Sequence, residues 1–300
     1  MYHGVMDTDR GQALVNVNQV GAASFRWQLE FLREHYTVVS LEDIVRRIKR
    51  ADPIDGLAAI TFDDGYLSVF ENAAPILRSL ELPSTVFLIA GCIEQNCLTW
   101  YDRVEAHVLH TSLQKIALEG VSYQLESDRG GAVRAIMSRL KTLGLEERDR
   151  IIAELVATAG PLTLEQSSPY RLMGWNQIRE LQSQGMSFGV HTYSHPHLSK
   201  VTGDLQLEIN DAAALVSKRL SIPLQDLIFC YPDGDYNKVV RDRVEASGMC
   251  GAVAVKNALT PPDSDPFALP RVAVGRAHSQ AMFCDATVGF TLRVKSFLTF

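Results

Sequence analysis

The feature that most constrains this chain is an alternation of short apolar runs with longer amphipathic segments. The apolar runs are rich in β-branched and aromatic side chains, as strands buried on both faces should be. They lie at residues 57–62, 84–89, 186–190 and 227–231, with shorter runs at 37–39, 251–255 and 271–274. Segments with one apolar face, which predict helices, lie between them at 24–35, 41–50, 72–80, 175–184, 204–220 and 237–247. About seven strand–helix repeats predict an α/β protein whose parallel sheet closes into a barrel.

One stretch interrupts this alternation. Residues 92–173 show no convincing strand pattern but carry helical patterns at 101–118, 133–143 and 146–159. A connection between a strand and a helix normally takes only a few residues. We therefore expect a single domain over 1–300, with a helical insertion at 92–173. Because the insertion leaves from the end of a barrel strand, we expect it to flank the mouth of any active site and to shape substrate choice.

Charge and composition exclude several classes of partner. The formal net charge of −6 argues against nucleic acid or an anionic membrane as the main partner. No apolar run approaches the roughly 20 residues that cross a bilayer, so no transmembrane segment is expected. The first residues lack the basic and apolar regions of a secretory signal, which as written predicts a cytoplasmic protein. A truncated N-terminus would instead allow an exported or membrane-associated one.

The cysteines give a weaker indication. Five cysteines are scattered along the chain, and none forms a Cys-x-x-Cys pair. An odd number suits a reducing compartment better than a disulfide framework. We expect most of them to be small buried side chains.

Two adjacent carboxylates mark the end of one predicted strand. Asp63 and Asp64 follow the run at 57–62 directly, and Gly65 comes next to turn the chain. In parallel α/β folds, active-site residues gather at the C-terminal ends of strands. Two close carboxylates repel one another, and one pKa rises unless a cation neutralises the pair. A bound metal ion meets this requirement, while a simple Asp-Asp-Gly turn is the other interpretation of the tripeptide alone.

Two histidines follow a second strand end. His191 and His195 come directly after the run at 186–190. Pro196 disfavours helix at His195, so we expect a tight loop rather than a helix face. Taken alone, the pair could equally be polar loop residues. Together with a strand-end aspartate it predicts a site of two histidines and one carboxylate, which leaves positions open for water and substrate, as in catalytic metal sites.

The motifs Thr-Phe-Asp-Asp-Gly and His-Thr-x-x-His resemble the first two motifs of the NodB-homology polysaccharide deacetylases, carbohydrate esterase family 4. The resemblance extends over most of the chain and leaves out most of the insertion. It covers residues 25–41, 72–91, 175–198 and 227–274.

The resemblance implies a distorted (β/α)7-type barrel and a metal-dependent hydrolase that removes N-acetyl groups from a sugar or polysaccharide. Asp63 would be the catalytic base, and Asp64, His191 and His195 would hold a divalent metal. The metal would be Zn²⁺ in most members, with Co²⁺ or a similar ion as the alternative, and it would polarise the acetamide carbonyl. By position in the third motif, the backbone N–H of Asp233 would stabilise the oxyanion.

The sequence departs from the family pattern in its later motifs. Cys230 stands where many members carry an arginine that keeps the base ionised. Arg271 could supply that charge from another strand end, or form an ordinary strand-end ion pair. The fourth motif, of the Asp-x-x-Asp-Trp type, is absent. His278 is the late histidine that could act as general acid, with an exposed loop residue as the alternative, and His3 is expected to line the pocket.

Two other functions stay open at this stage. Relatives that open cyclic ureides, or that remove a formyl group from an aminosugar lipid, share the metal ligands and are poorly separated by sequence. A non-catalytic carbohydrate-binding relative with decayed later motifs is the other alternative. The intact Asp63, Asp64, His191 and His195 oppose it.

Overall fold

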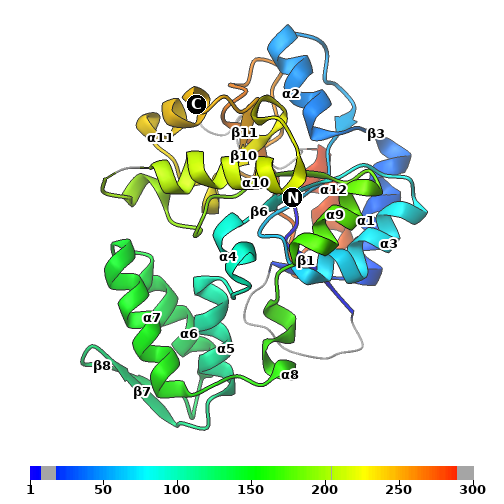
Figure 1. The fold of residues 1–300 in the computed structure, drawn as a ribbon. Helices are drawn as coiled ribbons and strands as arrows, with labels where there is room; N and C mark the ends of the chain where they lie inside the picture. The colour runs from blue at the N-terminus through cyan, green and yellow to red at the C-terminus, as the bar shows by residue number, and fades with distance from the viewer. Residues whose placement is uncertain (8–17, 204, 289–300) are drawn as a thin grey trace, which may run out of the picture.

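A computed structural model describes residues 1–7, 18–203 and 205–288. Its centre is a curled six-stranded parallel sheet in the order β12-β11-β10-β9-β6-β5 (Figure 1). The strands are β5 (Thr61–Phe62), β6 (Thr85–Leu88), β9 (Ser187–Val190), β10 (Ile228–Cys230), β11 (Gly251–Val255) and β12 (Leu269–Arg271). Every residue of β6 and β10 is buried, as parallel strands covered on both faces should be. The structure confirms the predicted α/β barrel class.

The first residues of the chain lie between the two edges of this sheet. The backbone N–H of Tyr2 donates to the carbonyl of Thr61 at 2.8 Å, and that of Asp63 donates to Tyr2 at 2.9 Å. On the other side, Val274 N–H donates to the carbonyl of Met1 at 2.9 Å. This segment therefore joins β5 to the chain that follows β12, and the curled sheet closes as a distorted barrel.

Helices cover the outside of the barrel. They are α1 (Ala22–His35), α2 (Leu41–Arg50), α3 (Ala74–Ser79), α9 (Trp175–Ser183), α10 (Ala212–Leu220), α11 (Lys238–Ala246) and α12 (Gln280–Val288). Short pairs β1 (Gly4–Met6) with β2 (Gln19–Gly21) and β3 (Thr37–Val38) with β4 (Leu57–Ala58) flank the sheet. The predicted helix at 204–220 begins as a π-helical turn, η5 (Gln206–Asp211), before α10. Among the described residues, none of the helices has the length and apolar character to span a membrane.

The insertion packs on an apolar core of its own, beside the barrel (Figure 1). It contains α4 (Ala90–Gln95), which starts just before it, then α5 (Trp100–His110), β7 (Lys115–Leu118), β8 (Val121–Gln124), α6 (Arg129–Leu140), α7 (Leu145–Ala159) and α8 (Leu164–Ser167). Its core is made by buried side chains from α5, β7, α6 and α7, among them Val104, Ile116, Ile136 and Ile152.

The insertion is not purely helical, so the sequence prediction was wrong on this point. The helix predicted over 101–118 ends at His110, and an antiparallel hairpin of β7 and β8 follows. Glu119 and Gly120 connect the two strands with φ angles of 46° and 78°, the pair of positive values that a two-residue hairpin turn requires. Ile116 and Leu118 are buried while their neighbours in β7 are exposed, which is strand periodicity rather than helical periodicity.

Candidate active site

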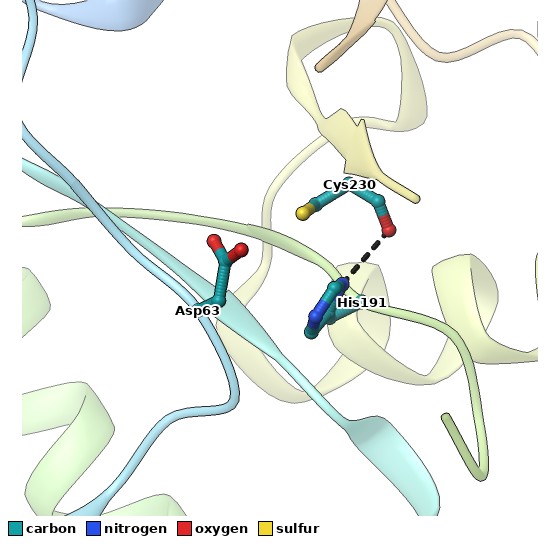
Figure 2. Close-up of side chains that lie close together, drawn as sticks. All are labelled: Asp63, His191 and Cys230. Atoms are coloured by element: carbon teal, nitrogen blue, oxygen red, sulfur yellow. Dashed lines mark hydrogen bonds between the residues drawn. The ribbon is translucent and has the colours of Figure 1, made fainter. Parts of the chain in front are cut away.

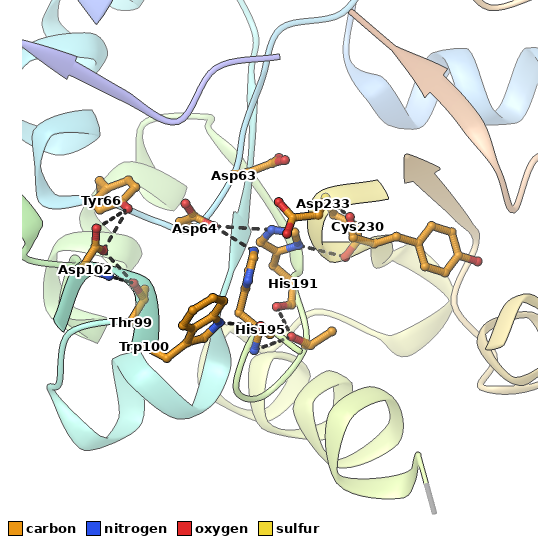
Figure 3. A network of polar contacts seen from close by, with 12 residues as sticks. Asp63, Asp64, Tyr66, Thr99, Trp100, Asp102, His191, His195, Cys230 and Asp233 are labelled. Carbon is orange, nitrogen blue, oxygen red and sulfur yellow. Dashed lines mark hydrogen bonds and ion pairs between the residues drawn. The ribbon is translucent and has the colours of Figure 1, made fainter. Parts of the chain in front are cut away.

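Asp64, His191 and His195 meet at the C-terminal ends of β5 and β9 (Figure 3). Oδ1 of Asp64 lies 3.4 Å from Nε2 of His191 and 3.6 Å from Nε2 of His195. All three side chains are buried. Asp64 Oδ1 receives no hydrogen bond from the described part of the chain, and a buried carboxylate oxygen without a partner is costly. A divalent cation among these atoms would satisfy it, and two imidazoles with one carboxylate suit such an ion.

The two loops that carry these residues have unusual backbone conformations. Asp64, Thr192 and His195 have φ angles of 74°, 65° and 58°, in the left-handed region that non-glycine residues seldom adopt. The loop after β9 is closed by a hydrogen bond of 2.9 Å from His195 N–H to Thr192 Oγ1. The predicted tight loop is therefore confirmed. Its strained conformation is of the kind that accumulates at functional sites.

Glu208 holds this loop by hydrogen bonds, and the sequence analysis did not identify it. Its carboxylate accepts hydrogen bonds from the N–H groups of Tyr193 at 3.0 Å and Ser194 at 2.9 Å. It also accepts one from the Ser194 hydroxyl at 2.7 Å. Glu208 is buried and lies in the π-helical turn η5. Such turns are frequent at functional sites, so the π-helical turn is the structural feature that points to Glu208 as part of the site.

Three more contacts fix the histidines themselves. Nδ1 of His191 lies 2.8 Å from the carbonyl oxygen of Cys230. The indole N–H of Trp100, in α5 of the insertion, donates to the carbonyl of His195 at 3.0 Å. The ring of Tyr101 packs edge-on against His195, with 5.0 Å between ring centroids. Outer contacts of this kind orient metal-binding imidazoles.

Asp63 lies beside this group and pairs with Arg271. Two parallel hydrogen bonds of 2.8 Å join the Arg271 guanidinium to the two carboxylate oxygens. Burial by itself raises the pKa of Asp63, but the adjacent Arg271 outweighs it and holds that pKa well below its ordinary value. Arg271 also donates to Cys230 Sγ at 3.0 Å. It thus supplies the positive charge that is absent at position 230.

Asp63, His191 and Cys230 form a second close group at the same end of the sheet (Figure 2). Its ligand atoms also lie within 4.8 Å of one another. Arg271 already neutralises Asp63 and occupies Cys230, so this group has no unmet need for a cation. Asp64, His191 and His195 fit a metal better.

Asp233 lies at the rim, in the turn η7 (Pro232–Gly234), with φ at 53°. Its carboxylate accepts a hydrogen bond of 2.9 Å from Lys141 Nζ and lies 2.8 Å from His197 Nε2. Burial works to raise the pKa of Asp233, but the contacts with His197 and Lys141 lower it overall. Lys141 belongs to the insertion, which therefore reaches the rim of the site. The role predicted for the Asp233 backbone N–H stays a prediction.

The two candidate histidines outside the metal group lie in different surroundings. His3 is close enough to Asp63, Asp64 and His195 to shift the pKa of each of them. Its Nδ1 is buried and has no partner within the described residues. His278 instead lies in the turn after β12, where its Nδ1 accepts a hydrogen bond of 3.1 Å from Gly275. The structure thus brings His3 to the group and uses His278 to close its own turn.

In parallel α/β barrels the active site lies at the C-terminal ends of the strands, which is where these acidic and histidine side chains converge. A sequence model described as Polysaccharide deacetylase matches residues 50–252. The chain belongs to the polysaccharide deacetylase family, whose members hydrolyse amide bonds.

Solved structures agree with this assignment at the level of the fold. The chain is similar to the Streptococcus pyogenes deacetylase PplD in complex with acetate, with 19% identity over 95% of both chains and a TM-score of 0.62. It is also similar to IcaB from Ammonifex degensii, at 17% identity over 96% of this chain and 93% of that one, with a TM-score of 0.55. A de-N-acetylase from Aggregatibacter actinomycetemcomitans matches at 14% identity, over 95% and 97%, with a TM-score of 0.57. No curated protein matches this chain.

Proposed function

We propose that this protein is a metal-dependent N-deacetylase that acts on an N-acetylated carbohydrate. The observation that carries the proposal is the buried Oδ1 of Asp64, which faces two imidazole nitrogens and has no hydrogen-bond partner in the described chain. Asp64, His191 and His195 would hold a divalent cation, and Zn²⁺ suits this set of nitrogen and oxygen ligands. Bound there, the metal supplies the positive charge that polarises an amide carbonyl and lowers the pKa of water.

Asp63 is the base in this proposal. Arg271 keeps its carboxylate ionised, so Asp63 can accept the proton of a water molecule that attacks the amide carbon. The two hydrogen bonds also fix the direction of the carboxylate. The backbone N–H of Asp233 would stabilise the negative charge that develops on the carbonyl oxygen.

His3 is the better candidate for the acid that protonates the leaving amine. It lies in the electrostatic surroundings of Asp63, Asp64 and His195, and its buried Nδ1 is unpartnered among the described residues. His278 is the alternative given by sequence position. His3 directly precedes β1, whereas Asp63 follows β5, so the proposed acid and base come from different segments of the chain.

Membership of the family supports an N-acetylated carbohydrate as substrate. One solved structure of similar fold is a deacetylase in complex with acetate, the product that an N-deacetylase releases. Lys141 of the insertion contacts Asp233 at the rim of the site, and Trp100 of the insertion contacts His195 in the loop after β9. We therefore infer that it contributes to the choice of glycan.

The test combines metal analysis with two substitutions. The purified protein should bind one equivalent of Zn²⁺ or Co²⁺ and release acetate from N-acetylglucosamine oligomers. Asp64→Ala should lose the metal, while Asp63→Asn should keep it and release no acetate. Stoichiometric metal without acetate release from any N-acetylated glycan would contradict the proposal. Ring opening of allantoin or release of formate would then identify another amide hydrolase, and no turnover would identify a non-catalytic relative.

A further inference from the structure

Cys92 and Cys97, five positions apart in the sequence, come together at the end of α4. Asn96 ends this helix in the left-handed conformation, with φ at 50°. The N–H of Cys97 donates to the carbonyl of Cys92 at 3.0 Å, and that of Asn96 donates to Ile93 at 3.2 Å. These two hydrogen bonds define a Schellman motif, in which the side chains of the first and last residues normally touch. Here those residues are Cys92 and Cys97.

The two thiols are chemically unequal. Cys97 is exposed, whereas Cys92 is partly buried. The neighbouring Cys92 thiol, together with the nearby Arg103, lowers the pKa of Cys97 to about 7. The neighbouring Cys97 and burial raise the pKa of Cys92. An accessible thiol with a lowered pKa beside a second thiol is the usual arrangement of a reactive pair with a resolving partner.

We propose that Cys92 and Cys97 are a redox-modification site that forms an intramolecular disulfide. With hydrogen peroxide as the oxidant, the Cys97 thiolate attacks one peroxide oxygen and becomes a sulfenic acid, and hydroxide leaves. The sulfur of Cys92 then attacks that sulfenic acid, giving the disulfide and a second water once protons are exchanged. Two thiols are oxidised and one peroxide is reduced to two waters.

Cys92 and Cys97 lie between two points at which their segment of the chain is hydrogen-bonded to the loop after β9, the loop that carries His191 and His195. On one side, the N–H groups of Ala90 and Gly91 donate to the carbonyls of Thr192 and Tyr193 at 3.0 and 2.9 Å. On the other side, Trp100 donates to His195. A disulfide between Cys92 and Cys97 covalently closes the turn between these two hydrogen-bonded points. The site is separate from the proposed metal ligands, so its chemistry can be read without measuring deacetylation.

The test uses the full chain, fully reduced and then treated with hydrogen peroxide. Trypsin releases both cysteines on one peptide, residues 79–103. Mass spectrometry should show that this peptide loses two hydrogens in most molecules and regains them with dithiothreitol. Cys250 and Cys284 should stay open to alkylation under the same treatment. Separate oxidation of Cys92 and Cys97 without a link, or alkylation of both after treatment, would overturn the proposal.

Two variants test the division of roles. In Cys92→Ser the resolving thiol is missing, so Cys97 should accumulate as a sulfenic acid that dimedone traps. In Cys92→Ala no polar side chain remains beside Cys97 at this position, and alkylation of Cys97 by iodoacetamide at pH 7 should slow several-fold. Cys284→Ser is the matched control and should leave the link unchanged. An unchanged alkylation rate in Cys92→Ala would show that Cys97 is not activated by its neighbour and would overturn the assignment of roles.

Discussion

Arg271 and Asp63, 208 positions apart in the chain, form a buried ion pair with two hydrogen bonds of 2.8 Å each. The guanidinium extends from the end of β12 across to the end of β5. It brings a positive charge to the proposed base from a different strand end than the family pattern predicts. Cys230 Sγ lies against the same guanidinium, so the residue at the position where the family pattern predicts an arginine contacts Arg271.

Replacing Arg271 by Met should impair the base. The pKa of Asp63 is depressed in the folded protein, and without the guanidinium it rises, so the acidic limb of the kcat/KM profile should move to higher pH. We expect kcat/KM near neutral pH to fall roughly 10²-fold, within the range for loss of a general base. Arg271→Lys keeps a charge but loses the paired geometry. Its kcat/KM should lie between that of the wild type and that of Arg271→Met. An acidic limb that does not move would contradict this role.

The same ion pair should make stability depend on pH. Because the folded pKa of Asp63 lies below its unfolded value, the pair stabilises the protein above the ordinary pKa of an aspartate. That stabilisation is lost as the pH falls toward the lower folded value. Breaking a buried pair costs about 3–5 kcal/mol. Urea unfolding should therefore show a larger difference between wild type and Arg271→Met at pH 7 than at pH 3.

Glu208→Gln should weaken metal binding without removing a ligand. A carboxylate offers two oxygens to the Tyr193 and Ser194 donors, whereas a glutamine offers one and turns an NH₂ group toward the others. Loss of such an outer contact typically lowers metal affinity 10–100-fold. Competition with a chromophoric chelator measures this. Asp211→Asn, exposed in the same turn, should bind metal like the wild type.

His3→Gln and His278→Gln separate the two candidates for the acid. If His3 protonates the leaving amine, His3→Gln should lower kcat by roughly 10²–10⁴-fold while stoichiometric metal is retained. His278→Gln should leave kcat close to that of the wild type, because its imidazole closes a turn. The reverse pattern would return the role to His278.

Lys141→Met tests the contact between the insertion and the rim. The ion pair with Asp233 is partly exposed, so its loss should cost less than about 1 kcal/mol of stability. Asp233 is held at a positive φ angle, and loss of one of the two contacts on its carboxylate should shift the backbone N–H beside it. We expect kcat/KM on oligosaccharides to fall several-fold with an unchanged melting temperature. Lys115→Met, in the exposed face of β7, is the control.

The sequence predicted the parts of the site that lie next to strand ends. Asp63, Asp64, His191 and His195 each follow an apolar run directly, and the backbone of a parallel sheet brings such ends together without further information. Glu208 could not be found in this way. It is one acidic residue in an amphipathic helical pattern, and its burial depends on a π-helical turn and on its contacts with the loop that follows β9.

Local turn chemistry explains another difference. The hairpin of β7 and β8 was missed because Glu119 is an uncommon first residue for a positive-φ turn, and helical residues dominate around it. Closure of the barrel by Tyr2 was equally hidden, since it depends on pairing with Thr61 far along the chain. Hydrophobic periodicity predicts which type of secondary structure a segment can form, while long-range hydrogen bonds decide where that segment lies in the fold.

The insertion's separate apolar core divides the protein into parts under different constraints. Val104, Ile116, Ile136 and Ile152 belong to this separate core, so substitutions among them should disturb the packing of the insertion before that of the barrel. The insertion contacts the rim of the site through side chains such as Trp100 and Lys141. Under the proposed function, the insertion could therefore be remodelled for another glycan while the residues of the barrel that carry the reaction stay unchanged.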